Sequence, residues 1–94
     1  MEFRFNTDPD TGLPHIYDHG VTKEEVRQVL AHPQENRAGS EDSFAAIGQT
    51  NGGRYLHVIY VPDADGDGAF VITAYPIRGQ QLKAFRRRRR RKGK

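Results

Sequence analysis

The second half of the chain holds three apolar segments separated by turn-forming residues, and this arrangement restricts the possible folds more than any other feature. The segments span residues 43–49, 54–61 and 69–77. Asn51-Gly52, between the first two, is the strongest short-range signal for a hairpin with a two-residue turn. An Asp/Gly loop separates the second segment from the third. We therefore expect a three-stranded antiparallel meander.

Two short helices are predicted ahead of this meander. Pro14 can occupy the first turn of a helix that runs to His19, where a glycine ends it. Thr22 and Glu25 form a capping box, and apolar residues follow at helical spacing. A second helix should therefore cover about residues 22–31.

The remaining segments complete the predicted α+β fold. Phe3 and Phe5 alternate with polar residues, which predicts a short strand, and residues 34–42 are predicted to be a polar loop. We expect two N-terminal helices packed on one face of a small, mainly antiparallel sheet, formed by the N-terminal strand and the meander. A C-terminal helix beginning near Gly79, with Leu82 and Phe85 able to dock three residues apart, should then run into a basic tail.

Strand pairing predicts which side chains share a face of the sheet. If Val61 pairs with Ala69, one face is apolar and should form the core under the helices. Its opposite pairs are Tyr60–Phe70, Val58–Ile72 and Leu56–Ala74.

The other face should be open and should carry Tyr55 opposite Tyr75, and His57 opposite Thr73. A two-residue turn would also place Gly48 beside Tyr55 and Ala46 beside His57. Large polar-tipped side chains beside two small ones would leave a shallow basin.

Charge divides the chain into a domain at residues 1–85 and a tail at residues 86–94. The tail holds eight of the 15 basic side chains, and the rest of the chain holds seven basic and all 12 acidic ones, a net charge of −5. Such asymmetry indicates a partner rich in phosphate or carboxylate. The tail residues predicted to bind nucleic acid are Arg86, Arg87, Arg88, Arg89, Arg90, Arg91 and Lys92.

The arginine run favours nucleic acid as the partner, with RNA expected, because each guanidinium presents donors matched to phosphate oxygens. Neutralising several phosphates gives salt-dependent affinity without sequence preference. Two alternatives stay open at this point: an acidic protein partner, or a solubilising tail with no specific role. Tyr55 and Lys83 are predicted to extend the nucleic-acid contact.

His57, Tyr75, Arg54 and Arg78 are the candidate catalytic residues. RNA cleavage without a metal needs a base for the 2′-hydroxyl, positive charge beside the phosphorane and an acid for the leaving oxygen. Histidine serves as acid or base near neutral pH, tyrosine donates a proton or stacks a base, and arginine supplies charge. The alternative is a histidine that only packs among cross-strand aromatic rings.

Two segments partly match metal sites, and we predict that neither binds a metal. His15 and His19 have the spacing of a zinc pair on a helix, yet no third ligand is evident. Residues 63–68 match the opening of an EF-hand loop, but Ala74 stands where the bidentate glutamate belongs. No cofactor is expected.

Several short segments resemble BrnT-type toxins of type II toxin–antitoxin systems, within the RelE/ParE superfamily. They are His19-Gly20-Val21, Ala46-Ile47-Gly48-Gln49-Thr50, Gly53-Arg54-Tyr55-Leu56, Val58-Ile59-Tyr60 and Val71-Ile72-Thr73-Ala74. The resemblance covers about residues 3–90 and implies a small α+β ribonuclease toxin, metal-independent mRNA cleavage and a cognate antitoxin protein. This chain carries Tyr75 where BrnT-type chains usually carry arginine, a role that Arg78 or Arg54 could take over.

Two further functions compete with the ribonuclease toxin. One is a non-catalytic nucleic-acid-binding module, and the other is an interaction protein on the same fold. The N-terminus shows no signal-peptide pattern and no apolar stretch approaches the length of a membrane span, so a cytoplasmic location is expected. The oligomeric state is left open.

Overall fold

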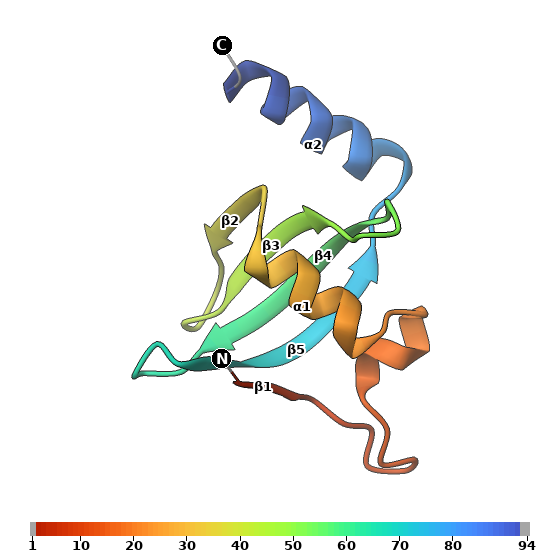
Figure 1. Ribbon diagram of the computed structural model, residues 1–94, viewed down its shortest axis with the longest axis vertical. Helices are drawn as coiled ribbons and strands as arrows, with labels where there is room; N and C mark the ends of the chain where they lie inside the picture. The colour runs from red at the N-terminus through yellow and green to blue at the C-terminus, as the bar shows by residue number, and fades with distance from the viewer. Residues whose placement is uncertain (1, 93–94) are drawn as a thin grey trace.

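The computed structural model describes the backbone of residues 2–92 and the side chains of residues 2–90. This part of the chain forms one five-stranded mixed sheet with two α-helices and a 3-10 helix (Figure 1). The strands are β1 (Glu2–Phe5), β2 (Glu35–Ala38), β3 (Phe44–Gln49), β4 (Tyr55–Pro62) and β5 (Gly68–Pro76). The helices are η1 (His15–His19), α1 (Lys23–Ala31) and α2 (Gly79–Lys92). The sheet order is β1-β5-β4-β3-β2, and β1 runs parallel to β5 while the other neighbours are antiparallel.

The expected arrangement of two N-terminal helices on an N-terminal strand and a three-stranded meander is wrong. The first predicted helix is the short 3-10 helix η1, so the described part of the chain has only one α-helix between β1 and β2. Residues 35–38, predicted to be loop, form the edge strand β2 and pair with β3. Its sequence shows no apolar alternation because three of its four side chains are exposed, as is usual for a polar edge strand.

The turn between β3 and β4 is longer than Asn51-Gly52 predicts, and this shifts the register by one residue. Thr50 and Arg54 close the turn, since the Thr50 amide donates to the Arg54 carbonyl at 2.8 Å. Gly53 supplies the positive φ, 97°, that such a three-residue loop requires. Gly48 therefore lies opposite Leu56, on the core face, and neither Gly48 nor Ala46 takes its predicted place beside Tyr55 or His57.

The register between β4 and β5 also differs from the prediction. His57 lies opposite Tyr75 instead of Thr73, and Val58 lies opposite Ala74. A bulge between Ile59 and Tyr60 restores the alternation further along the strands. Because of this bulge, fully buried Val71 takes the core position that had been assigned to Phe70 and Ile72.

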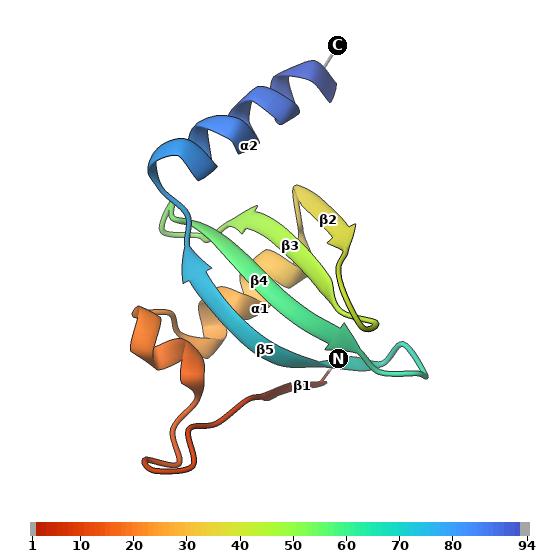
Figure 2. The ribbon, with the colours of Figure 1, turned by 180° about the vertical axis from the view of Figure 1, so that it is seen from behind.

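Helix α1 covers one face of the sheet and encloses the main core (Figures 1 and 2). The predicted capping box at its start is present, with Thr22 accepting from the Glu25 amide and Glu25 accepting from the Thr22 amide. Gly48 allows the close approach of α1, because a Cβ there would lie 3.1 Å from Val29 Cγ1. The fully buried residues of this cluster are Ile16, Val21, Val26, Val29, Leu56, Val58, Val71 and Ala74.

Helix α2 approaches from the opposite face, over the end of the sheet where β5 finishes (Figure 2). Phe85, only 1% exposed, docks on Ile47 and Ile77 in a second, smaller cluster. Tyr55, Tyr75 and Leu82 pack around this cluster as partly buried residues. The two faces of the sheet therefore carry two separate hydrophobic cores.

Candidate functional site

His57 and Tyr75 form a hydrogen-bonded pair on the face of the sheet turned toward α2. Their cross-strand positions on β4 and β5 bring the Tyr75 hydroxyl to 2.9 Å from His57 Nδ1, with ring centroids 5.1 Å apart. Since Nδ1 is engaged by Tyr75, Nε2 is the ring nitrogen that a ligand can reach. The role of Nε2 depends on the tautomer of the ring. If Nδ1 carries the proton and donates a hydrogen bond to Tyr75, Nε2 can act as a base; if the Tyr75 hydroxyl donates to Nδ1, Nε2 carries the proton and is a hydrogen-bond donor.

A cleft of about 250 Å³, the His57 cleft, opens between the sheet and α2. Strands β2, β3 and β4 form its floor, and α2 forms its wall. Its polar lining comes from Glu35, Arg37, His57, Gln81 and Arg88, and its apolar lining from Ala45, Ile47, Ile77 and Ala84. The cleft therefore combines a titratable imidazole with one acidic and two basic side chains.

Glu35 is the central charge of the His57 cleft. Its side chain is only 9% exposed. Arg88 donates two hydrogen bonds to its carboxylate, from Nε to Oε2 and from a terminal nitrogen to Oε1, each 2.8 Å long. Arg37 Nε lies 3.6 Å from Oε1 of the same carboxylate, and the Arg37 side chain is 61% exposed. Such a bidentate pair fixes α2 against β2 as well as balancing the charge.

The environment of His57 lowers the pKa of its imidazole. Burial is the largest cause, because it disfavours the charged form. The carboxylate of Glu35 opposes this shift by raising the pKa, and the charge of Arg88 adds to it by lowering the pKa. The shift therefore favours the neutral imidazole, the form that a base requires.

The rings of η1 extend the aromatic cluster beyond the cleft. His19 lies edge-on to Tyr75 with centroids 6.1 Å apart, and His15 lies edge-on to His19 at 5.3 Å. These contacts continue the line of rings from His57 across β5 to η1.

Neither of the two arginines assigned to catalysis from the sequence lines the His57 cleft. Arg54 turns toward α1, where it donates to Glu25 at 2.8 Å and to the Gly20 carbonyl at 2.8 Å. Burial raises the pKa of the Glu25 carboxyl. The hydrogen bonds and the positive charge of Arg54, together with hydrogen bonds from Thr22, outweigh burial, so the pKa is lowered overall. Arg78 is exposed and lines a different hollow, beside Tyr55.

The basic tail continues α2 as a helix as far as Lys92. Arg88 and Arg89 reach the body, Arg89 by donating to the Gln34 carbonyl at 2.8 Å. Lys83, Arg87 and Arg90 are exposed. The side chains of Arg91 and Lys92 lie outside the described residues.

Residues 15–76 match the family described as a domain of unknown function, DUF4258. The chain belongs to this family. The match runs from η1 to the end of β5, so it contains Glu35, Arg37, His57 and Tyr75. Helix α2 with its arginines lies outside the DUF4258 region. No curated protein and no solved structure matches the chain.

Glu35 and Arg37 were not selected from the sequence, and Arg88 was not assigned to the His57 cleft. Glu35 and Arg37 lie two apart, as alternate residues on one face of a strand do, but the polar segment was taken for a loop. Arg88 was predicted only as one of several equivalent tail arginines. Helical spacing from Leu82 and Phe85 was the signal that would have placed Arg88 on the docked face of α2.

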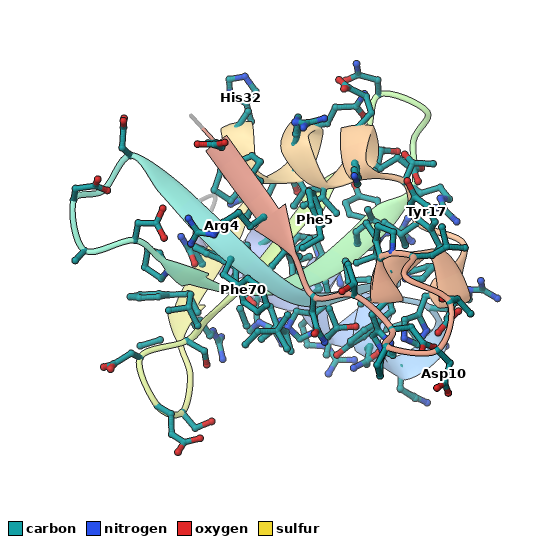
Figure 3. All side chains as sticks on the ribbon, turned by 90° about the horizontal axis from the view of Figure 1, so that it is seen from below. Arg4, Phe5, Asp10, Tyr17, His32 and Phe70 are labelled. Atoms are coloured by element: carbon teal, nitrogen blue, oxygen red, sulfur yellow. The ribbon has the colours of Figure 1, made fainter. Side chains whose placement is uncertain are left out.

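The two segments that partly match metal sites have other contacts. His15 lies 3.6 Å from Asp18, and Asp63 pairs with Arg4 of β1, which lies near the β4–β5 loop (Figure 3). Among the described residues, no three His, Cys, Asp or Glu side chains are grouped to hold a metal ion. In the same part of the chain, no helix is long and apolar enough to cross a membrane.

Proposed function

We propose that this DUF4258 protein binds RNA and cleaves it, without a metal, in the His57 cleft. The observation that carries the proposal is the His57–Tyr75 pair beside a cleft lined by Glu35, Arg37 and Arg88. The resemblance to BrnT-type toxins points to the same chemistry. It also implies a place in a toxin–antitoxin system, with mRNA as substrate and a cognate antitoxin as protein partner.

The proposed reaction begins with the 2′-hydroxyl of a ribose attacking the adjacent phosphorus. His57 Nε2 takes the hydroxyl proton while Nδ1 donates to the Tyr75 hydroxyl, which holds the ring and stabilises the imidazolium that forms. The bond from 2′-oxygen to phosphorus forms and the bond to the 5′-oxygen breaks. Water, to which the cleft is open, protonates the departing oxygen, and the hydroxide that remains takes the proton back from the His57 imidazolium. The products are a 2′,3′-cyclic phosphate and a 5′-hydroxyl.

The arginines of the cleft supply the positive charge that this reaction needs. Arg37 is the more exposed of the two and can contact a phosphate directly, while Arg88 remains paired with Glu35. Positive groups fixed beside the developing phosphorane stabilise it more than they stabilise the ground state. Exposed Arg87 and Arg90 on α2 extend the basic surface along which an RNA backbone can lie.

One observation favours a second candidate, a nucleic-acid-binding module without catalysis. Arg54 and Arg88 are each engaged by a glutamate, and Glu35 places a negative charge in the cleft itself. A phosphate entering the cleft must compete with that carboxylate. In this alternative the Glu35–Arg88 pair serves to hold α2, and only α2 contacts RNA.

The decisive test is cleavage of single-stranded RNA by the purified protein in the presence of EDTA. The ribonuclease proposal predicts products that end in 2′,3′-cyclic phosphate, at a rate unaffected by the chelator. Binding of the same RNA without any cleavage would support the non-catalytic module instead. Induced expression should arrest growth if the protein is a toxin, and co-expression of its antitoxin should restore growth.

A further inference from the structure

A second hollow, the Tyr55 pocket, lies beside the His57 cleft under α2. Its volume is about 370 Å³, within the range of small-molecule pockets, roughly 300–1000 Å³. Ile77 lines both the pocket and the cleft, so a chain of nucleotides can enter both at once. The lining residues that bear on its chemistry are Gln49, Arg54, Tyr55, Ile77, Arg78 and Arg86.

The Tyr55 ring is held in place and partly exposed. Phe85 packs against it at a tilt, with centroids 5.6 Å apart, and fixes its orientation. The guanidinium of Arg86 lies over the ring, 5.7 Å from its centroid. Tyrosine rings and arginine planes are the two surfaces on which proteins stack unpaired bases.

Polar groups at the edge of the pocket suit a base and its phosphate. The Gln49 side-chain nitrogen donates to the Gly53 carbonyl at 3.2 Å, which leaves the side-chain oxygen as an acceptor for a base edge. Arg78 is exposed at the rim and can contact a phosphate. Arg54 is already bonded to Glu25 and forms part of the wall.

We propose that the Tyr55 pocket binds an unpaired nucleobase of single-stranded RNA, stacked on the Tyr55 ring, with the Arg86 guanidinium displaced from over the ring onto the outer face of the base. The base belongs to a nucleotide next to the one held in the His57 cleft, because the two sites share a wall. This inference rests on the proposed binding of RNA and deepens it. It makes the protein selective for single strands, since a base inside a duplex cannot leave its stack without a cost of a few kcal/mol.

The test measures binding in a His57→Ala background, so that cleavage plays no part. The probe is a short single-stranded oligoribonucleotide carrying 2-aminopurine, a base whose fluorescence is quenched by stacking, at one position after another. Tyr55→Leu should weaken binding about 5- to 150-fold, the usual effect of removing one stacked base. It should also abolish quenching at the position that Tyr55 stacks, whereas Tyr55→Phe should retain both.

Controls separate loss of stacking from loss of charge or of folding. Tyr17→Leu, an exposed tyrosine on η1 (Figure 3), should bind as the parent does. Arg86→Gln should reduce both the quenching and the salt dependence, while Tyr55→Leu should leave the salt dependence unchanged. A duplex of the same sequence should bind more weakly than the single strand.

Unchanged affinity and quenching in Tyr55→Leu, or equal affinity for duplex and single strand, would overturn the base pocket. Neither result would touch the cleavage proposal, which is tested separately on the unmodified protein. If RNA bound with the expected quenching but the unmodified protein did not cleave it, the ribonuclease proposal would be wrong and the base pocket would stand.

Discussion

Under α1 the sheet contributes Leu56, Val58 and Val71, none of them exposed, to a continuous apolar core. Under α2 the buried cluster consists of Ile47, Ile77 and Phe85, and beside it lie a cleft and a pocket whose linings mix charged and apolar side chains. The same strands supply both faces, because successive side chains of a strand point to opposite sides. The first face provides most of the buried apolar surface, which frees the second to carry titratable and basic groups.

Removing the tail is the largest test of this division. Deletion of residues 86–94 should leave the α1 core folded, because none of its members lies in α2. Affinity for single-stranded RNA should fall by orders of magnitude at low salt. The plot of log affinity against log salt should flatten by about 0.7 for each phosphate that the shortened chain no longer neutralises. Affinity titrations at several salt concentrations measure this, and an unfolded truncated chain or an unchanged slope would contradict it.

Truncating one buried side chain in each core should have different effects, a global loss of stability in the α1 core and a local unfolding of α2 in the other. Leu56→Ala should lower the global free energy of unfolding by about 2–5 kcal/mol, since a fully buried side chain is lost. Phe85→Ala should release α2 while the sheet stays folded. Hydrogen exchange would show lost protection in α2 and retained protection in β4 and β5. Equal loss of protection throughout the chain in Phe85→Ala would mean that the two cores unfold as one.

Gly48→Ala tests how tightly α1 packs on the sheet. The added methyl would lie 3.1 Å from Val29 Cγ1, so α1 must shift or the Val29 side chain must move. We expect a loss of about 1–3 kcal/mol in stability, typical of overpacking. Denaturant unfolding measures it, and Gly52→Ala, in the exposed turn, is the control. A gain in stability in Gly48→Ala would show that the packing between α1 and the sheet can accommodate an extra methyl group.

The smallest expected effect is a pH dependence of stability due to His57. Its pKa is lowered in the folded protein by burial, so below about pH 6.5 the unfolded chain takes up a proton that the folded chain does not. Stability should therefore fall as the pH drops from about 6.5 toward the folded pKa, by at most about 1.4 kcal/mol per pH unit. Loss of the Glu25–Arg54 pair begins only at lower pH, near the ordinary carboxyl pKa of about 4.3. The His57→Gln variant should not show the loss of stability that begins near pH 6.5. If the variant still showed this loss, another titrating group would be its cause.

The sequence predicted the antiparallel order of β3, β4 and β5, the capping box, and the shared face of His57 and Tyr75, because turn residues, a capping motif and strand alternation are local signals. It missed β2, whose polar residues lack a strand signal and pair only because β3 lies beside them. It misplaced Gly48 because the turn length depends on how Thr50 and Arg54 close it. Arg88 and Glu35 are 53 residues apart, and only the docking of α2 brings them together. Side chains that meet through tertiary packing leave no local signature in one sequence.

The most direct measurement of the central claim is the single-turnover rate of RNA cleavage by the unmodified protein and by His57→Ala in EDTA. The rate should fall by about 10²–10⁴-fold, the usual contribution of a general base, while RNA affinity changes little. His32→Ala is the matched control, because His32 projects from the end of α1, away from the cleft (Figure 3). Its rate should equal that of the unmodified protein. Equal rates in His57→Ala and in the unmodified protein would show that the His57 cleft is not where RNA is cleaved.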